Sequence, residues 1–439
     1  MISAEVRPAT AGLPPRTDVE SRRGRWTLVA WAAAVALAVA LPSRSPVASA
    51  LTGETVPGVT LELSPGYLAA APVLGVWDAL AVLSIPQHLA VLGGLISIFL
   101  LWRLSRARGA RSRGLVAALA WETLALALFV GGVLVFYAVG AVIPRPMAAL
   151  RVEDPDVVVV DFHSHTLSSH DGRGSFTAER NRAWHRDSGY HVAFITDHDS
   201  VRAALDAAAA NPRRAGAGTV ILPGREVVYR QQHVAVLGLI DPRAILASAG
   251  DGSSVIDAQG RCPTWPVLVH TIPEDLDLVP VPECPDGAGG VHAIELIDGA
   301  PRGLGQGDRE RERILAIADS LDLAVVASSN LHGWARTASG WSLLRIPGWR
   351  DMSPEQVGFL IEEKIRIEGR DAVEVIGRRR PVETEVGLAV AGLPIRFALD
   401  FLSQLGRAER MIWLLWLALA SVATLRFGAR RRDLSAAAR

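Results

Sequence analysis

The sequence predicts an α/β domain, a distorted (β/α)7-type barrel, joined to about four transmembrane α-helices. Three observations lead to this fold class. Short β-branched runs alternate with helical patterns between residues 150 and 405. Long apolar runs lie before and after that region, and half of all residues are hydrophobic, which is high for a soluble enzyme. Histidines gather just after several of the predicted strands.

The apolar runs predict where the chain meets a membrane. Residues 1–25 are polar and arginine-rich and are expected to be cytoplasmic. A transmembrane region follows at residues 26–143, with helices at about 26–41, 85–102 and 115–143. Residues 67–84 are apolar but contain Pro72 and Asp78, so they predict an interfacial or re-entrant segment. Residues 411–427 predict a C-terminal transmembrane helix, and residues 428–439 a cytoplasmic tail.

Arginines flank the predicted helices at both ends of the chain and in residues 103–113. Because cytoplasmic segments are enriched in basic residues, the chain is expected to be a multi-pass cell-membrane protein with an extracytoplasmic α/β domain. The first apolar run also resembles a signal peptide, but the helices that follow favour a retained helix. Glu122 interrupts the third helix and is expected near the interface or, alternatively, buried in the bundle as a functional group.

Charge and cysteine content exclude some function classes. The 45 basic and 45 acidic residues give a formal net charge of zero, so nucleic-acid binding is not implied. Cys262 and Cys284 lack the C-x-x-C spacing of a structural zinc site, so any metal must bind to His and carboxylate side chains. In an extracytoplasmic domain these cysteines are expected to form a disulfide; two free thiols are the alternative.

Seven apolar runs predict the strands of the α/β domain: residues 157–162, 192–196, 220–222, 234–239, 267–270, 293–297 and 324–327. Helical patterns occupy residues 177–188, 203–210, 308–321 and 352–368. The last helix begins at Ser353-Pro354-Glu355, a start signal with proline at the first helical position. This alternation is typical of barrels whose functional residues follow the strands.

Metal-type ligands follow the first two of these strands. His163 and His165 end the first, and a strand places residues i and i+2 on one face, so both imidazoles point the same way. His170 and Asp171 come next, and the second strand delivers Asp197-His198-Asp199. A lone histidine is more often a packed or capping residue. Ten of the eleven histidines, however, lie between positions 163 and 332, which favours the ligand interpretation.

Further motifs follow later strands: Pro223-Gly224-Arg225-Glu226, then His233, His270 and Asn330-Leu331-His332. Together with His163-Ser164-His165 and Thr196-Asp197-His198, in this order, they resemble the signature of the polymerase and histidinol phosphatase (PHP) family of metal-dependent phosphoesterases. The resemblance covers residues 156–380 and implies a PHP-like barrel at residues 150–405. It also implies two or three divalent metal ions, which for His and carboxylate ligands are zinc, manganese or iron.

The resemblance also implies how the metals are shared. One metal is expected on His163, His165, Glu226 and Asn330, a second on Glu226, His233 and His270, and a third on His198, His332 and either His170 or Asp171. Catalytic roles are expected for the bridging Glu226 and for His198 and His332. Asn330 stands where the family usually has aspartate, and an amide oxygen is a weaker ligand than a carboxylate.

Other polar residues near the motifs have less specific roles. His185, His191 and His292 are expected to be structural. Glu295 is either a hydrogen-bond partner of a ligating histidine or a surface carboxylate. Arg173, Arg225 and Arg336 flank the motifs and are candidates to contact a substrate phosphate.

These features predict a membrane-anchored phosphoesterase that hydrolyses a phosphate ester through a metal-activated hydroxide in a multinuclear His/Glu site. The expected partners are the lipid bilayer and a phosphorylated small molecule or lipid-linked phosphate. The alternative is a non-catalytic metal- or ligand-binding sensor domain coupled to the membrane helices, with Asn330 marking lost catalysis.

Overall fold

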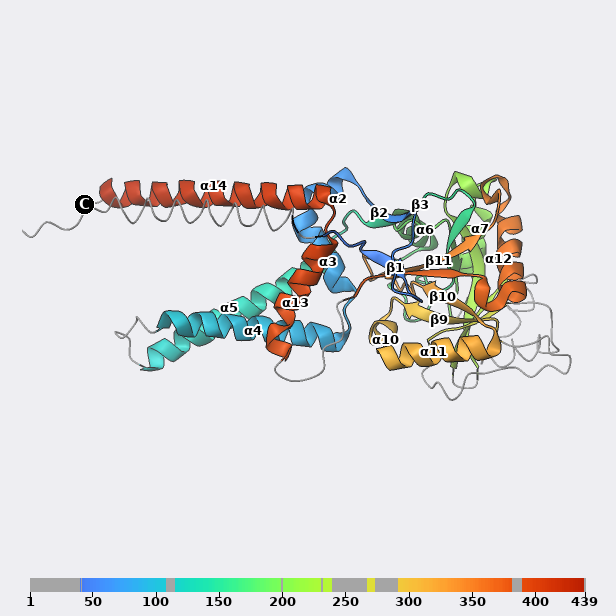
Figure 1. Cartoon of the computed structure of the whole chain (residues 1–439), viewed down its shortest axis with the longest axis horizontal. Helices are drawn as coiled ribbons and strands as arrows, with labels where there is room; N and C mark the ends of the chain where they lie inside the picture. The colour runs from blue at the N-terminus through green and yellow to red at the C-terminus, as the bar shows by residue number, and fades with distance from the viewer. Residues whose placement is uncertain are drawn as a thin grey trace, which may run out of the picture.

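The structure, a computed structural model, describes residue 40 and residues 42–107, 115–198, 200–229, 232–238, 267–272, 291–380 and 389–437. It has two parts, an α/β domain and a group of helices that extends from one end of it and is called the helical arm below (Figure 1). The first predicted transmembrane helix, apart from residue 40, lies outside the described residues. So do Cys262 and Cys284.

A mixed sheet of ten strands, in the order β1-β12-β11-β4-β5-β6-β7-β8-β9-β10, forms the α/β domain. Its strands are β1 Val47–Ser49, β4 Val157–Asp161, β5 Val192–Ile195, β6 Val220–Tyr229, β7 Gln232–Leu237, β8 Val267–His270, β9 Ala293–Asp298, β10 Ala324–Ser328, β11 Gly340–Arg345 and β12 Glu374–Arg378. A separate antiparallel pair joins β2 Val59–Leu63 to β3 Ala148–Val152. All seven predicted strands are present, and their buried β-branched runs form the core of the domain.

The sheet departs from a regular (β/α)7 barrel. Parallel pairing is found in β4-β5-β6 and in β8-β9-β10, whereas β7 pairs antiparallel with both β6 and β8. The reason is the length of the connection, because β7 starts at Gln232 and β6 ends at Tyr229. A parallel crossover needs roughly a dozen residues or more, so this connection can only form a hairpin.

The sheet curls so that its last strand approaches β11. Ser342 of β11 donates a hydrogen bond to the carbonyl of Ala327 in β10 at 2.9 Å and accepts one from the Ala327 N–H at 2.8 Å. Beyond these strands, Ser164 and Leu331 form an isolated parallel bridge. The curl therefore brings the loops that follow β4 and β10 side by side.

Helices cover the outside of the sheet, namely α6 Ala178–Asp187, α7 Arg202–Ala209, α10 Pro301–Leu304, α11 Asp308–Leu321 and α12 Pro354–Glu368, with 3-10 turns η1 Ala215–Ala217, η3 Trp349–Asp351 and η4 Gly369–Asp371. Their ends follow local sequence signals. The Thr177 hydroxyl caps α6, and Ser353 and Gln356 form a capping box at α12. In α11, Ile314 and Ala318 are spaced by one helical turn and are buried against the sheet.

The helical arm consists of α2 Pro65–Ala69, α3 Ala71–Ala81, α4 Ile85–Ala107, α5 Leu115–Val142, α13 Ala389–Gln404 and α14 Arg407–Ala437. Within the described residues, Ile85–Ser105 and Val116–Val142 are long and apolar enough to cross a membrane. Both helices expose large apolar side chains, including Leu89, Leu101 and Leu128.

The further span predicted at residues 411–427 is not among these two helices; it lies in part outside the residues whose side chains are described, so it stays a prediction. These residues belong to α14. Their apolar run lies between two charged residues, Arg410 and Arg426. The run is therefore shorter than the ~20 residues that span a bilayer. Among the described residues, two helices, not the predicted four, are found with the length and hydropathy of a membrane span.

Glu122 of α5 is paired with Arg103 of α4. Arg103 donates to both carboxylate oxygens, each at 2.7 Å. Arg103 is near the C-terminal end of α4 and Glu122 is near the N-terminal end of α5. These two helix ends lie far from the α/β domain (Figure 1). The carboxylate is 45% exposed and has a cationic partner; its place relative to a membrane stays a prediction.

Residues 67–84 form α2, α3 and the turns beside them, and Asp78 in α3 is only 3% exposed. Its carboxylate accepts hydrogen bonds from the Tyr67 hydroxyl at 3.0 Å and from the Thr337 hydroxyl at 2.8 Å, and it is paired with the buried guanidinium of Arg145. Thr337 belongs to the α/β domain, five positions after His332. Asp78 therefore joins the helical arm to the loop that follows β10.

We expect Asp78→Ala to lower the free energy of unfolding by about 3–5 kcal/mol, because Arg145 would stay buried without its anion. Thermal unfolding of the detergent-solubilised full chain measures the change. The matched control is Asp351→Ala, which removes an exposed pair with Arg214 and is expected to cost less than about 1 kcal/mol. Equal losses in the two variants would contradict the role assigned to Asp78.

Candidate metal centre

Two adjacent loops present the first histidines of the site. His163 and His165 follow β4, and Asn330 and Leu331 follow β10. The Asn330 N–H donates to the His163 carbonyl, and the His165 N–H donates to the Leu331 carbonyl, both at 2.9 Å. The backbone therefore fixes the H-x-H segment against the segment that carries His332.

Glu226 of β6 lies at the centre of the site and is 4% exposed. Its Oε2 atom is 3.0 Å from His163 Nε2, 3.2 Å from His165 Nε2 and 3.2 Å from His198 Nε2. Its Oε1 atom is 2.9 Å from His233 Nδ1. One carboxylate thus faces four imidazoles, which is the arrangement expected of a ligand shared between metals.

The contacts of His163 show that a cation fits this position. Its Nδ1 atom is 2.9 Å from Glu295 Oε1, which suits an Nδ1–H that donates to an ionised Glu295. In the neutral ring, the Nε2 lone pair then faces both the Glu226 carboxylate and His165 Nε2, which is 2.9 Å away. Electron pairs directed at one another repel, and either a proton or a metal ion between these atoms removes the repulsion. Metal-ligating histidines usually have a carboxylate or carbonyl partner on their other ring nitrogen, and Glu295 is such a partner for His163.

Other ligand-type atoms also lack partners. Within the described part of the chain, His270 Nε2 and Asn330 Oδ1 are buried and accept no hydrogen bond. Buried polar atoms are nearly always paired, so these two are suited to an additional ligand. Imidazole nitrogens with carboxylate and amide oxygens form a donor set for zinc, manganese or iron. The residues present therefore fit the implied divalent metals.

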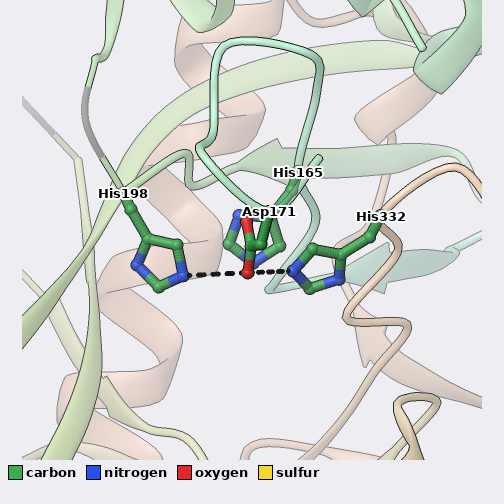
Figure 2. Close-up of side chains that lie close together, drawn as sticks. All are labelled: His165, Asp171, His198 and His332. Carbon is green, nitrogen blue, oxygen red and sulfur yellow. Dashed lines mark hydrogen bonds and ion pairs between the residues drawn. The ribbon is translucent and has the colours of Figure 1, made fainter. Parts of the chain in front are cut away.

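A second cluster, continuous with the first, brings together His165, Asp171, His198 and His332 (Figure 2). Asp171 Oδ2 is 2.8 Å from His332 Nε2 and 3.6 Å from His198 Nε2. The His165 and His332 rings stack with centroids 4.2 Å apart. Of the two adjacent candidates, it is Asp171 rather than His170 that enters this cluster; the His170 ring lies beside His198, with centroids 5.0 Å apart.

The described residues thus form three overlapping groups that could hold a metal: His163, His165 and Glu226; His198, Glu226 and His233; His165, Asp171, His198 and His332. This differs from the expected sharing, because His198 joins Glu226 and His233. His270, on β8, is outside these groups, and its Nδ1 atom is 2.5 Å from the Thr271 carbonyl. The Asn330 side chain donates to Asp298 Oδ2 at 3.1 Å.

Burial and charge set the protonation of the central groups. Burial opposes a charged Glu226, but His163 and the hydrogen bonds from its neighbours lower the pKa of this carboxyl well below its usual range. Burial likewise opposes a charged His163, yet Glu226 and Glu295 raise its pKa well above the ordinary value. Burial lowers the pKa of His165 to about 3, so this ring is neutral. A neutral imidazole beside an ionised carboxylate is the form that binds metal.

Glu295 and Asp161 support the site from behind. Glu295 is fully buried against His163, so the surface alternative for this residue is wrong. The sequence interpretation missed Asp161, whose carboxylate lies 2.6 Å from His185 Nε2 and accepts from Ser329 at 2.9 Å (N–H) and 2.5 Å (hydroxyl). His185 is therefore structural. A signal for Asp161 was its place at the end of an apolar run, two positions before His163.

The arginines that flank the motifs lie beside this loop region. Arg173 donates its backbone N–H to the His332 carbonyl at 2.9 Å, and its guanidinium lies 4.9 Å from the ring centroid of Trp334. Burial lowers the pKa of Arg336, and so do the positive charges of Arg173 and other nearby arginines. Arg225 donates to the His198 carbonyl at 3.2 Å. Arg173 and Arg336 therefore add positive charge next to the His332 segment.

We expect Asn330→Asp to tighten the weakest-bound metal by about tenfold, because a carboxylate binds divalent cations better than an amide does. Aspartate tolerates the left-handed backbone of this position, where φ is 42°. Without metal the same change should lower the unfolding temperature, since it places a second carboxylate against Asp298. Metal titrations followed by thermal unfolding measure both effects. Superimposable titrations of the two proteins would show that residue 330 is not a ligand.

No protein-family model and no curated protein matches the chain. Solved structures that overlap with it include PsfC from Pseudomonas syringae, at 17% identity and a TM-score of 0.35 over 57% of this chain and 100% of PsfC. A two-domain protein from Bacteroides vulgatus, described as containing a predicted PHP-like metal-dependent phosphoesterase, overlaps at 15% identity and a TM-score of 0.31, over 47% of this chain and 66% of its own.

An amidohydrolase from Chromobacterium violaceum, with bound sulfate and no metal, overlaps at 18% identity and a TM-score of 0.25, over 45% of this chain and 92% of its own. The neighbours thus include PHP-like and amidohydrolase proteins at low identity and partial overlap. At this level of similarity they assign the chain to no family.

Proposed function

We propose that this chain is a membrane-anchored, metal-dependent phosphoesterase of the PHP type. The observation that carries the proposal is Glu226, a buried and ionised carboxylate with imidazoles of His163, His165, His198 and His233 within 3.2 Å of its oxygens. A metal ion would fit between His163 Nε2, His165 Nε2 and the Glu226 carboxylate. The motifs that supply these residues also occur in the order typical of that family.

Divalent metals, when bound in such a site, lower the pKa of water and neutralise charge on phosphoryl oxygens. The chain supplies the rest. Glu226 and Asp171 would supply the negative charges that balance bound metals, and Glu295 would accept from His163 Nδ1 and so direct its Nε2 atom at the metal. Arg173 and Arg336 provide a positive region beside His332 that suits a phosphate group.

The substrate that suits this chain is a phosphate ester, either a small molecule or a lipid-linked phosphate at the membrane surface. In Figure 1 the end of α4 and the start of α5 lie at the far end of the helical arm, away from the α/β domain, and the sequence that joins these two helices is rich in arginine. Under the positive-inside rule that end is cytoplasmic, which supports an extracytoplasmic α/β domain. Protease access to the α/β domain in intact cells tests the orientation, and a domain shielded until the membrane is opened would overturn it.

The activity is tested with the full chain in detergent, stripped of metal by a chelator and reloaded with zinc, manganese or iron. We expect turnover of a chromogenic phosphate ester that depends on the added metal and follows its stoichiometry. Metal binding without turnover of any phosphate ester would favour the non-catalytic sensor. A protein that binds no metal would overturn the phosphoesterase and the metal sensor, and would leave only a sensor of another ligand.

A further inference from the structure

A cavity of about 430 Å³ lies between the helical arm and the α/β domain, and its lining contains none of the candidate metal ligands. Ser84 and Gln87 at the start of α4 line it from the arm, together with Asp400 and Gln404 of α13. The α/β domain contributes the end of β12 and the segment from α10 to α11. The cavity therefore lies at the level where a membrane helix meets the domain outside the bilayer.

The lining of this cavity is strongly basic. Five arginines and two aspartates face it, a formal excess of three positive charges; the arginines are Arg44, Arg311, Arg378, Arg379 and Arg380. Their described hydrogen bonds include several to backbone carbonyls. Arg379 donates to Ser45 at 2.9 Å, and Arg380 donates to Leu304 at 3.4 Å. Arg378 is also paired with Asp78 at 3.5 Å, which reduces the formal excess to two positive charges. A lining of this net charge would stabilise an anion in the cavity.

A buried amide at the cavity wall also indicates a ligand. Gln306 is 4% exposed and lines the cavity, and neither its Oε1 nor its Nε2 atom has a hydrogen-bond partner in the described part of the chain. A buried amide without partners is costly, and nearly all such groups in folded proteins are paired. A phosphate oxygen would accept from Nε2, and a ligand hydroxyl would donate to Oε1. Phosphate and hydroxyl groups together form the polar head of a glycerol phosphate.

The same helix that borders the basic cavity also borders an apolar one. A cavity of about 710 Å³ lies among the membrane helices and is lined by Phe397 and Phe401 of α13 and by apolar residues of α4 and α5. Both phenylalanines also line a third cavity, which shares Asp400, Gln404 and several arginines with the basic one. Basic and apolar spaces thus follow one another along α13, as the head and tails of an amphiphile require.

We propose that this boundary binds an anionic phospholipid, with its phosphate among the arginines beside Gln306 and its acyl chains in the apolar cavity. The site is separate from the metal centre and does not depend on the proposed hydrolase activity. Its ligand anchors the α/β domain to the helical arm, because it contacts α4, α13, β12 and the segment between α10 and α11 at the same time.

Native mass spectrometry of the delipidated full chain in detergent tests the proposal. Phosphatidylglycerol is titrated against phosphatidylcholine and against sn-glycerol 3-phosphate. We expect the anionic lipid to bind at least tenfold more tightly than either of the other two, since only it combines a net negative head with acyl chains. The variants Gln306→Leu and Arg380→Gln are each expected to weaken phosphatidylglycerol by about tenfold or more. The control Arg186→Gln, on the exposed face of α6, should bind as the parent does.

Thermal unfolding separates a ligand-binding Gln306 from a structural one. Without lipid, Gln306→Leu should unfold at the parent's temperature or higher, because it removes an unpaired buried amide. With phosphatidylglycerol, the parent should gain more stability than the variant. Equal binding of the two lipids, or unchanged affinity in both variants, would overturn the proposal. So would glycerol 3-phosphate binding as tightly as the lipid, which would assign the cavity to a soluble phosphate.

Discussion

Replacing Glu226 with glutamine is expected to lower phosphoesterase turnover by more than about 100-fold and to remove metal from the site. Glutamine keeps the shape of the side chain but loses the charge that faces His163, His165 and His198. Since Glu226 belongs to two of the three candidate metal groups, the loss should extend to more than one ion. Metal content by elemental analysis and turnover of a chromogenic phosphate ester, both on the full chain, measure the effect.

The matched control is Glu374→Gln, the same change at an exposed position of β12. It should leave metal content and turnover at the parent's values. Thermal unfolding of both metal-free proteins shows whether Glu226→Gln folds. A folded Glu226→Gln protein with full metal occupancy and unchanged turnover would show that Glu226 is not the shared ligand.

The strands of the α/β domain could be predicted because each is a short β-branched run, and all seven were found. The pairing of these strands could not be predicted from the sequence. The antiparallel strand β7 looks like its parallel neighbours in sequence, because strands of either kind can be apolar on both faces when the sheet is covered. β11 and β12, like β1, β2 and β3, were not predicted. In β11 and β12 the apolar runs are interrupted by Gly340, Ser342 and Gly377, although Gly340 and Gly377 pack closely on Ile297. Their pairing with distant segments overrides weak local propensity.

The residues of the candidate site could be predicted from the sequence, but their grouping around each metal could not. Ligands in short motifs, such as His163 and His165, follow directly from the period of a strand. The choice between His170 and Asp171 depends instead on a turn whose shape spacing does not determine. The grouping of His198 with Glu226 and His233 depends on the β6–β7 hairpin, since His233 is paired with Val228 across it. Motif order thus predicts which residues gather, while the curl of the sheet decides which of them share an ion.

Asp161 connects the sheet to the segments that carry the candidate ligands. It lies at the end of β4, fully buried, and connects α6 through His185 with the loop after β10 through Ser329. Asn330 follows Ser329 directly, and His332 lies three positions after Ser329. The Asp161 carboxylate belongs to none of the candidate metal groups. It accepts a hydrogen bond from the backbone N–H of His163 at 3.3 Å, so its role is to position the two loops that carry the ligands.

We therefore expect Asp161→Ala to destabilise the protein by about 3 kcal/mol or more, because His185 and the Ser329 N–H and hydroxyl would stay buried without their acceptor. The milder Asp161→Asn keeps one acceptor oxygen and should fold, yet bind metal about 10–100-fold more weakly, as changes behind metal ligands usually do. Asp206→Ala, at an exposed position of α7, is the control and should alter neither property. Unfolding temperature and metal affinity are measured on each full chain. Parent-like metal affinity in a folded Asp161→Asn protein would limit Asp161 to a purely structural role.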